Sequence, residues 1–394
     1  LELGGKLFDD YHASRVLPGF QPDSKLTMLT QLRDTMEIVI VISAADIEKN
    51  KVRQDLGITY DVDVLRLREE FMNQGFLVNS VVITHYSGQV SAQNYSQRLE
   101  RLGIKTYYHY TIEGYPHNVA LIDSEEGFGK NDYIETTRPL VVVTAPGPGS
   151  GKMAVCLSQL YNEHVRGNQA GYAKFETFPV WDLPLKHPVN IAYEAATADL
   201  NDVNMIDPFH LEAYGKIASS YNRDIEIFPV LNALFEGIYG ESPYKSPTDM
   251  GVNRIGFGIY DDEAVREAAK QEIIRRFMLA KVDYKKGKIA ESTLERAELL
   301  MKEVDASEED RVVVAPARKY AEFRREQNSK YENMVVMAIE MPDGTIVTGR
   351  SSRRMAAAGA AVLNAIKKLG LKIEEVREFP IDGTNHAVIV LRRV

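Results

Sequence analysis

A glycine-rich run at residues 147–152, Gly-Pro-Gly-Ser-Gly-Lys, has the composition of a loop that holds phosphate. It follows an apolar run at residues 140–144 and precedes a stretch with helical spacing at residues 152–165. Glycines let consecutive backbone N–H groups converge on an anion, and the N-terminus of a helix adds positive potential. A lysine at the end of the run can reach a terminal phosphate as a point charge. The contacts that this pattern predicts are Gly147, Gly149, Ser150, Gly151 and Lys152.

The run departs from the usual P-loop pattern at two positions. That pattern would place Gly at position 146 and Ser or Thr at position 153, where this sequence has Pro146 and Met153. The missing hydroxyl normally binds the Mg²⁺ ion that bridges the phosphates. Phosphate binding is therefore better supported than nucleotide hydrolysis, and a nucleoside triphosphate with Mg²⁺ is one candidate cofactor. The alternative is a Gly/Pro-rich connection that only turns the chain.

Ionisable side chains gather after this run, most densely at residues 199–210. A phosphoryl-transfer or ligase site needs such groups to hold Mg²⁺ and to activate a nucleophile. Ligands of an open parallel sheet sit outside the carboxyl ends of its strands, so we expect carboxylates of residues 176–210 to face the lysine of the loop. The alternative is a solvated segment with Asx turns and a helix cap. The candidate catalytic residues are Lys152, Glu176, Asp199, Asp202, Asp207 and His210.

The elements that would position these residues follow an α/β pattern. Short β-branched or apolar runs predict strands, and segments with apolar residues at helical spacing between them predict helices, which together indicate a parallel sheet covered on both faces. Residues 175–247 show few clear periods and are expected to be mostly irregular. The predicted strands are 37–42, 78–84, 104–110 and 140–144, and the predicted helices are 63–73, 92–102 and 152–165.

The second half of the chain has a different sequence pattern. Charged amphipathic helices at residues 262–281 and 291–304 predict a helical subdomain. After them, a helix at 316–327, strands at 334–340 and 345–348, a helix at 354–369 and a strand at 387–391 predict a smaller α/β lobe. The predicted domains are a phosphate-binding α/β domain at 1–255, the helical subdomain at 256–309 and the C-terminal lobe at 310–394.

Composition excludes several classes of function. The formal net charge of −9 over 394 residues disfavours nucleic-acid binding, and Arg275-Arg276 and Arg353-Arg354 are interpreted as solvated faces. No apolar run is long enough to span a bilayer, so we expect no membrane partner. The single cysteine disfavours disulfides and thiolate zinc sites, which points to the cytoplasm. No metal-ligand spacing is recognisable among the histidines, and a metal site stays open.

Four stretches resemble a known bacterial family, that of domain of unknown function 1846. They are residues 4–15, 145–153, 174–179 and 244–253. The resemblance covers nearly the whole chain, and it implies a C-terminal subdomain similar in topology to cytidine deaminases. The deaminase zinc motif is absent, since residues 351–355 read Ser-Ser-Arg-Arg-Met where its helix would begin. We therefore expect that lobe to lack zinc and to serve as a scaffold or an oligomerisation surface.

Two functions from different classes remain. The first is an enzyme that binds a nucleotide or another phosphorylated small molecule and carries out phosphoryl transfer or ligation. The second is a non-catalytic phosphate-ligand sensor or assembly protein. Met153 favours the sensor, whereas the many ionisable groups between residues 174 and 253 favour the enzyme.

Overall fold

The computed structural model describes residues 1–53, 55–381 and 384–393, and from residue 371 onward it describes the backbone. The chain divides into two compact units, Leu1–Leu300 and Met301–Val394. The boundary falls inside α12 (Glu291–Glu303). The division into three domains stays a prediction.

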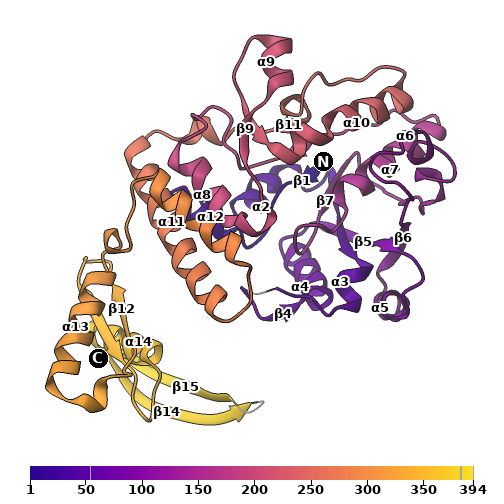
Figure 1. Cartoon of the computed structure of the whole chain (residues 1–394). Helices are drawn as coiled ribbons and strands as arrows, with labels where there is room; N and C mark the ends of the chain where they lie inside the picture. The colour runs from indigo at the N-terminus through magenta and orange to yellow at the C-terminus, as the bar shows by residue number, and fades with distance from the viewer. Residues whose placement is uncertain (54, 382–383, 394) are drawn as a thin grey trace. The chain divides into compact units, whose positions relative to one another are not determined.

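A seven-stranded sheet, parallel throughout, forms the centre of the first unit, as predicted (Figure 1). Its long central strands are runs of β-branched residues, as expected of strands buried on both faces. In spatial order the strands are β11 (Gly251–Val252), β8 (Lys174–Phe175), β1 (Glu2–Leu3), β7 (Leu140–Thr144), β2 (Met36–Ser43), β5 (Leu77–Tyr86) and β6 (Lys105–Tyr110).

Helices cover both faces of this sheet, so α-helices and strands form three layers. Ile38, Ile40 and Ile42 of β2 pack into one core with α4 (Tyr60–Asn73) and α5 (Val90–Arg101). Val39 and Val41 point the other way, into a second core. The helices of that second core are α7 (Lys152–Val165) and α10 (Asn222–Tyr239).

The strand order reverses between β2 and β7. From β2 the chain adds β5 and then β6 on one side, and it then returns to place β7 on the other side of β2. The connections that leave β2 and β7 therefore cover opposite faces of the sheet. In open parallel sheets, the carboxyl ends of two such strands are where ligands bind. The glycine run follows β7 and begins α7, so it lies at this switch point.

Residues 175–247 are not mostly irregular, and the sequence prediction was wrong there. They contain α8 (Pro188–Ala196), α9 (Pro208–Tyr214) and α10, with a hairpin of β9 (Asn204–Ile206) and β10 (Ser219–Tyr221). The prolines that obscured two of these helices sit at the first helical position, where a missing N–H costs nothing. The third helix continues past Pro229 because its later residues bury an apolar face.

The remaining elements of this unit frame the sheet. Helix α11 packs against α8 and α1, and its Arg275 and Arg276 bind the buried carboxylate of Glu272, so they are not a freely solvated face. These elements are α1 (Tyr11–Val16), α2 (Ser24–Leu29), α3 (Ala44–Glu48), β3 (Val52–Arg53), β4 (Ile58–Thr59), α6 (Val119–Ile122) and α11 (Asp262–Lys285). Among the described residues, no helix has both the length and the apolar character needed to cross a bilayer.

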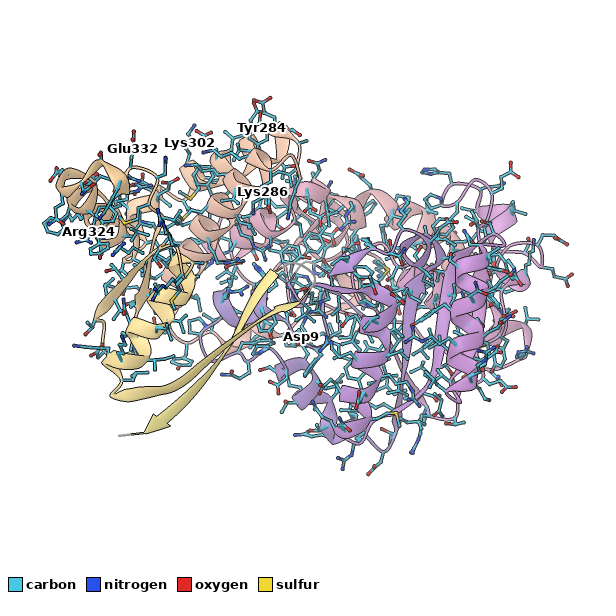
Figure 2. The ribbon with its side chains drawn as sticks, turned by 90° about the horizontal axis from the view of Figure 1, so that it is seen from below. Asp9, Tyr284, Lys286, Lys302, Arg324 and Glu332 are labelled. Atoms are coloured by element: carbon cyan, nitrogen blue, oxygen red, sulfur yellow. The ribbon has the colours of Figure 1, made fainter. Side chains whose placement is uncertain are left out.

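The second unit has the order helix, strand, strand, helix, strand, strand. The last two strands form a long antiparallel hairpin, drawn as a yellow ribbon in Figure 2. Its first strand was not predicted, because residues 371–381 carry many charges and lack a run of apolar residues. The elements are α13 (Val314–Gln327), β12 (Val336–Glu340), β13 (Ile346–Arg350), α14 (Ala357–Lys368), β14 (Leu371–Ile381) and β15 (Thr384–Arg393).

A close approach between β13 and α14 makes Gly349 essential to this unit. A Cβ at Gly349 would lie 2.0 Å from the backbone nitrogen of Ala361, which cannot move without shifting the helix. We expect Gly349→Ala to lower the free energy of unfolding of the second unit by about 1–3 kcal/mol. Gly359→Ala is the control, because its Cβ would meet only the flexible Met355 side chain at 3.3 Å. That control should stabilise α14 by up to about 1 kcal/mol. Urea unfolding followed by far-UV circular dichroism measures both effects, and equal stability of the two variants would contradict the packing.

Candidate functional site

The loop at residues 147–152 depends on its glycines. Gly149 and Gly151 have φ values of 74° and 85°, in the left-handed region that other residues rarely adopt. Gly147 lies against Tyr60, whose hydroxyl oxygen would be 2.3 Å from an added Cβ. The three glycines therefore serve backbone shape and close packing, and the predicted contacts of residues 147–152 with an anion stay a prediction.

The polar groups of this loop are largely unpaired. Within the described chain, the backbone N–H groups of residues 149–154 have no protein acceptor, and the first bond of this helix runs from Val155 N to Gly151 O. Ser150 is 3% exposed, and its hydroxyl also lacks a partner among the described residues. Free N–H groups occur at every helix start, but a buried hydroxyl without a partner is uncommon and costly. An anion at the loop would satisfy both.

Two neighbouring strand ends contribute polar side chains beside the loop. Thr84 of β5 donates from its hydroxyl to the Ser150 carbonyl at 2.6 Å. His85 follows, and its Nδ1 lies 3.3 Å from Thr84 Oγ1 and 3.3 Å from Ser43 Oγ at the end of β2. We call Ser43, Thr84, His85 and residues 147–154 the strand-end site. Sequence analysis missed the first three, although hydroxyl and imidazole side chains at the ends of apolar runs were a usable signal.

A different group of charges acts on Lys152 electrostatically. In a buried ionisable cluster, Tyr172 donates to Glu2 at 2.7 Å, and Lys174 Nζ lies 2.6 Å from both Glu176 and Asp224. This cluster comes from β1, β8 and the first turn of α10. Burial lowers the pKa of Lys152, while the nearby Glu2 carboxylate opposes that change and Lys174 adds to it. The lysine of the loop is thus electrostatically linked to the cluster.

Glu176 is the member of this cluster whose protonation can change near neutral pH. Burial raises its pKa to about 7; the Lys174 ammonium opposes the rise, and the Asp224 carboxylate adds to it. The same Asp224 carboxylate helps to hold the pKa of Lys174 above its ordinary value, against the effect of burial. A carboxyl group with a pKa near 7 can both accept and donate a proton at physiological pH.

Two of the other predicted catalytic residues, Asp202 and Asp207, form an ion pair or hydrogen bonds with other side chains. Asp202 is buried and lies 2.6 Å from Arg223. Asp207 is the N-cap of α9, where it accepts from His210 N at 3.0 Å and from the Thr248 hydroxyl at 2.6 Å. The structure therefore brings Asp207 and His210 together, and it pairs Glu176 with Lys174. Asp199 is exposed on a short 3-10 helix. A catalytic role for these residues stays a prediction.

The acidic and basic residues after β1 are engaged in ion pairs. Asp10 lies 2.7 Å from the buried Lys25, which also donates to the Lys6 carbonyl at 3.1 Å. Asp9 pairs with two arginines and is labelled in Figure 2. Within the part of the chain that the structure describes, no group of three His, Cys, Asp or Glu side chains could hold a metal ion. These contacts are of the kind that stabilise a fold.

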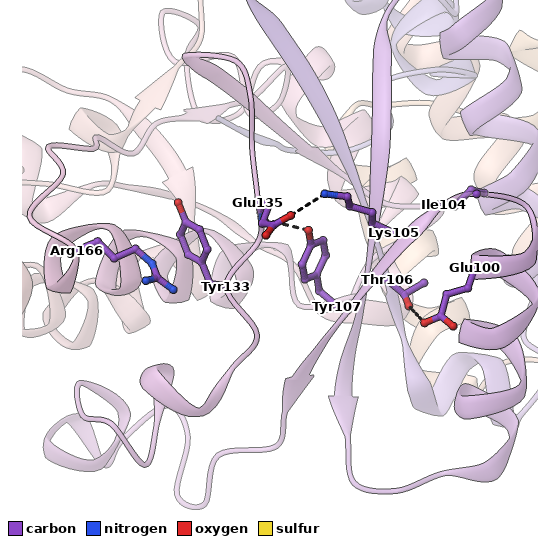
Figure 3. A pocket seen from close by; sticks show the side chains of 9 residues that line it. Glu100, Ile104, Lys105, Thr106, Tyr107, Tyr133, Glu135 and Arg166 are labelled. Carbon is purple, nitrogen blue, oxygen red and sulfur yellow. Dashed lines mark hydrogen bonds and ion pairs between the residues drawn. The ribbon is translucent and has the colours of Figure 1, made fainter.

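A shallow hollow lies at the opposite edge of the sheet (Figure 3). It is lined by the start of β6, by Tyr133 and Glu135, and by Arg166 after the end of α7. Its two cations already have partners, since Lys105 lies 2.7 Å from Glu135 and Arg166 lies over the Tyr133 ring at 3.9 Å. Glu100 accepts from the Thr106 hydroxyl at 3.2 Å. The glycine loop is at the carboxyl ends of the strands, so this hollow is separate from the strand-end site.

Comparison with known proteins identifies the family. The family described as domain of unknown function DUF1846, N-terminal, matches residues 1–305, and its C-terminal counterpart matches residues 309–378. The chain belongs to the DUF1846 family.

Relatives of this DUF1846 chain include proteins named UPF0371 from Clostridium botulinum. One from strain ATCC 19397 / Type A is 60% identical over 368 residues, which is 93% of this chain and 73% of that protein. Another from strain Alaska E43 / Type E3 is 59% identical over 370 residues, or 94% of this chain and 74% of that protein.

Three of the four stretches that carry the family resemblance lie at one edge of the sheet. Residues 4–15 follow β1, residues 145–153 follow β7, and residues 174–179 begin with β8 and run past its end. These strands belong to one parallel sheet, so their carboxyl ends face the same way. Residues 244–250 instead lead into β11 and lie before its amino end. In this DUF1846 chain, the first three stretches therefore gather at the edge that carries the strand-end site.

Proposed function

We propose that the chain is an enzyme that binds the phosphate of a nucleotide or another phosphorylated small molecule at the strand-end site. The observation that carries this proposal is the buried, unpartnered hydroxyl of Ser150 beside the unpaired N–H groups of residues 149–154. Their position at the switch point of the sheet supports it, because ligands of such sheets bind there. The reaction that we propose is phosphoryl transfer or ligation.

The residues of this site suggest separate roles in phosphate binding and in proton exchange. The N–H groups and the Ser150 hydroxyl would hold the phosphate oxygens, as helix N-termini do. Glu176, with a pKa of about 7, would exchange a proton with its surroundings and so change the charge around Lys152. Met153 offers no oxygen ligand to Mg²⁺, so the loop does not fit a protein-held metal, and we derive no step through one.

The proposal also covers the cell compartment and the partners of the chain. The single cysteine, Cys156, is a buried free thiol of the second core, in keeping with a reducing cytoplasm. A homo-oligomer and the absence of a nucleic-acid partner remain predictions.

A matched pair of serine variants tests the phosphate site. Removing the unpartnered Ser150 hydroxyl by Ser150→Ala should leave the free energy of unfolding unchanged or raise it by up to about 1 kcal/mol. Ser158→Ala, on the helix that follows the loop, should lower it by about 1–3 kcal/mol, because the Ser158 hydroxyl accepts from Asn131 at 3.0 Å and donates to Phe128 O at 3.2 Å. Isothermal calorimetry with phosphate and ATP should show affinity about tenfold weaker for Ser150→Ala alone.

The outcomes separate the rival functions. If Ser150→Ala destabilises the protein and leaves phosphate affinity unchanged, the hydroxyl is structural and the proposed site is wrong. If ATP and sugar phosphates bind the wild-type loop but ³¹P NMR shows no product, the chain is a sensor, the second function that Met153 favours.

A further inference from the structure

A β-bulge re-aims His85 at the strand-end site. The alternation of β5 sends Val81 and Ile83 into the first core, and His85 would follow them. Instead the pairing of β5 with β6 shifts register between Ile83 and Tyr86, and His85 adopts a left-handed φ of 51°. The side chain is consequently exposed. Bulges and strained backbone of this kind concentrate at functional sites, where they turn a side chain toward its task.

The hydrogen bonds of Thr84 favour one tautomer of the His85 ring. The single hydroxyl proton of Thr84 is donated to a carbonyl, that of Ser150 at 2.6 Å or of Ile42 at 3.4 Å. Toward His85, Thr84 Oγ1 can therefore act only as an acceptor. With the hydrogen on Nδ1, the contacts to Thr84 Oγ1 and Ser43 Oγ, both at 3.3 Å, are both hydrogen bonds. With the hydrogen on Nε2, only the Ser43 hydroxyl could donate to Nδ1 and the Thr84 contact would not be a hydrogen bond. The tautomer that keeps both bonds leaves Nε2 as the unprotonated, basic nitrogen.

We propose that His85 is the catalytic base of the strand-end site, acting through Nε2 on a hydroxyl or water that attacks the bound phosphorus. This inference rests on the proposed phosphate site. Thr84 bonds directly to the loop, and the His85 ring lies 3.3 Å from the same Thr84 oxygen, so the proposal places the imidazole beside the phosphate. As the attacking oxygen forms its bond to phosphorus, its proton passes to Nε2. The bond from phosphorus to the leaving oxygen breaks, the electron pair stays on that oxygen, and the imidazolium returns the proton to it.

Inorganic phosphate is a sufficient probe, because water can attack it and exchange its oxygens. Three measurements on the wild-type chain and on His85→Asn test the proposal: calorimetry, two-bond ¹H–¹⁵N spectra of labelled histidines, and loss of ¹⁸O from labelled phosphate by ³¹P NMR. The Asn amide keeps a donor at the position of Nδ1 and lacks Nε2. His164→Asn, on the last turn of α7, is the control.

The expected results distinguish this proposal from the phosphate site itself. Wild-type His85 should be the Nδ1–H tautomer, and phosphate should shift its Nε2 signal. His85→Asn should bind phosphate within about twofold of wild type but exchange oxygen at least about 100-fold more slowly. Failure of the wild-type chain to bind phosphate would remove the proposed function. Binding with an Nε2–H tautomer, with no exchange, or with equal exchange in His85→Asn would overturn the role of His85 alone.

Discussion

Replacing Arg53 by alanine is expected to lower the free energy of unfolding of the first unit by about 3–5 kcal/mol. Arg53 is 4% exposed and lies 2.9 Å from both Asp55 and Asp63 and 3.2 Å from Asp9. Asp63 is fully buried, and Arg66, at 2.8 Å, is its other ionic partner among the described residues. Removing one partner of a buried ion pair leaves charge without compensation, which costs far more than the pair contributes.

The loss would extend to the chain after β1. Asp9 has a left-handed φ of 60°, which is unfavourable for a non-glycine residue. Its two arginine contacts, with Arg53 at 3.2 Å and Arg66 at 2.5 Å, hold it there. We therefore expect the segment after β1 to loosen in Arg53→Ala before the sheet itself unfolds.

The single tryptophan, Trp181, reports the unfolding of this unit by fluorescence in urea. Lys105→Met is the matched control, because Lys105 and Glu135 are 58% and 68% exposed in their side chains. An exposed pair of this kind contributes little to stability, because solvent screens it. If Arg53→Ala proves no less stable than Lys105→Met, the buried network does not stabilise the fold.

Removing the buried carboxyl group of residue 176 is expected to change how stability depends on pH. Folding raises the pKa of Glu176 to about 7, mainly through burial. At pH values between the ordinary pKa of a glutamate and about 7, the folded chain binds more protons than the unfolded chain. The contribution of Glu176 to the stability of the fold is therefore lost as the pH rises. Relative to wild type, Glu176→Gln should therefore gain on the order of 2 kcal/mol of stability between pH 5 and pH 8.

The comparison must be made as a difference from wild type, because other groups titrate in the opposite direction. Burial lowers the pKa of His109 to about 4, so its contribution to stability is lost as the pH falls. Urea unfolding followed by Trp181 at both pH values gives the difference directly. Glu135→Gln is the control, since Lys105 keeps the pKa of Glu135 below its ordinary value and that carboxylate stays ionised throughout. A constant difference between Glu176→Gln and wild type would show that Glu176 is ionised at both pH values.

The central strands were predictable, and the edge strands on one side were not. β2 contains the unbroken apolar run 38–42, and β7 contains the run 140–143; such a run identifies a buried strand without knowledge of its neighbours. β1, β8 and β11 have two residues each and carry charged or small side chains. Such segments become strands only because parallel neighbours pair with their backbones. The residues that they place, Glu2 and Lys174 among them, could not be assigned to a cluster from sequence.

The candidate site was predicted in part for the same reason. The glycine run can be recognised from sequence because it depends only on neighbouring residues, which predict a strand before it and a helix after it. His85 and Ser43 are far from it in sequence, and only the sheet brings them beside it. For Asp207, the local pattern fits two roles. Its position before Pro208 and His210 predicts a helix cap as well as it predicts a metal ligand.

By itself, the sequence determined the α/β class, the parallel arrangement of the long strands and the position of a glycine loop at the start of a helix. These follow from periodicity and from the backbone freedom of glycine, which act over a few residues. The tertiary structure alone decided which strand ends meet, that Lys174 bridges two carboxylates in a buried cluster, and that His85 at a bulge lies beside Ser43. Those outcomes depend on strand pairing and burial between segments distant in the chain, which no short sequence pattern can predict.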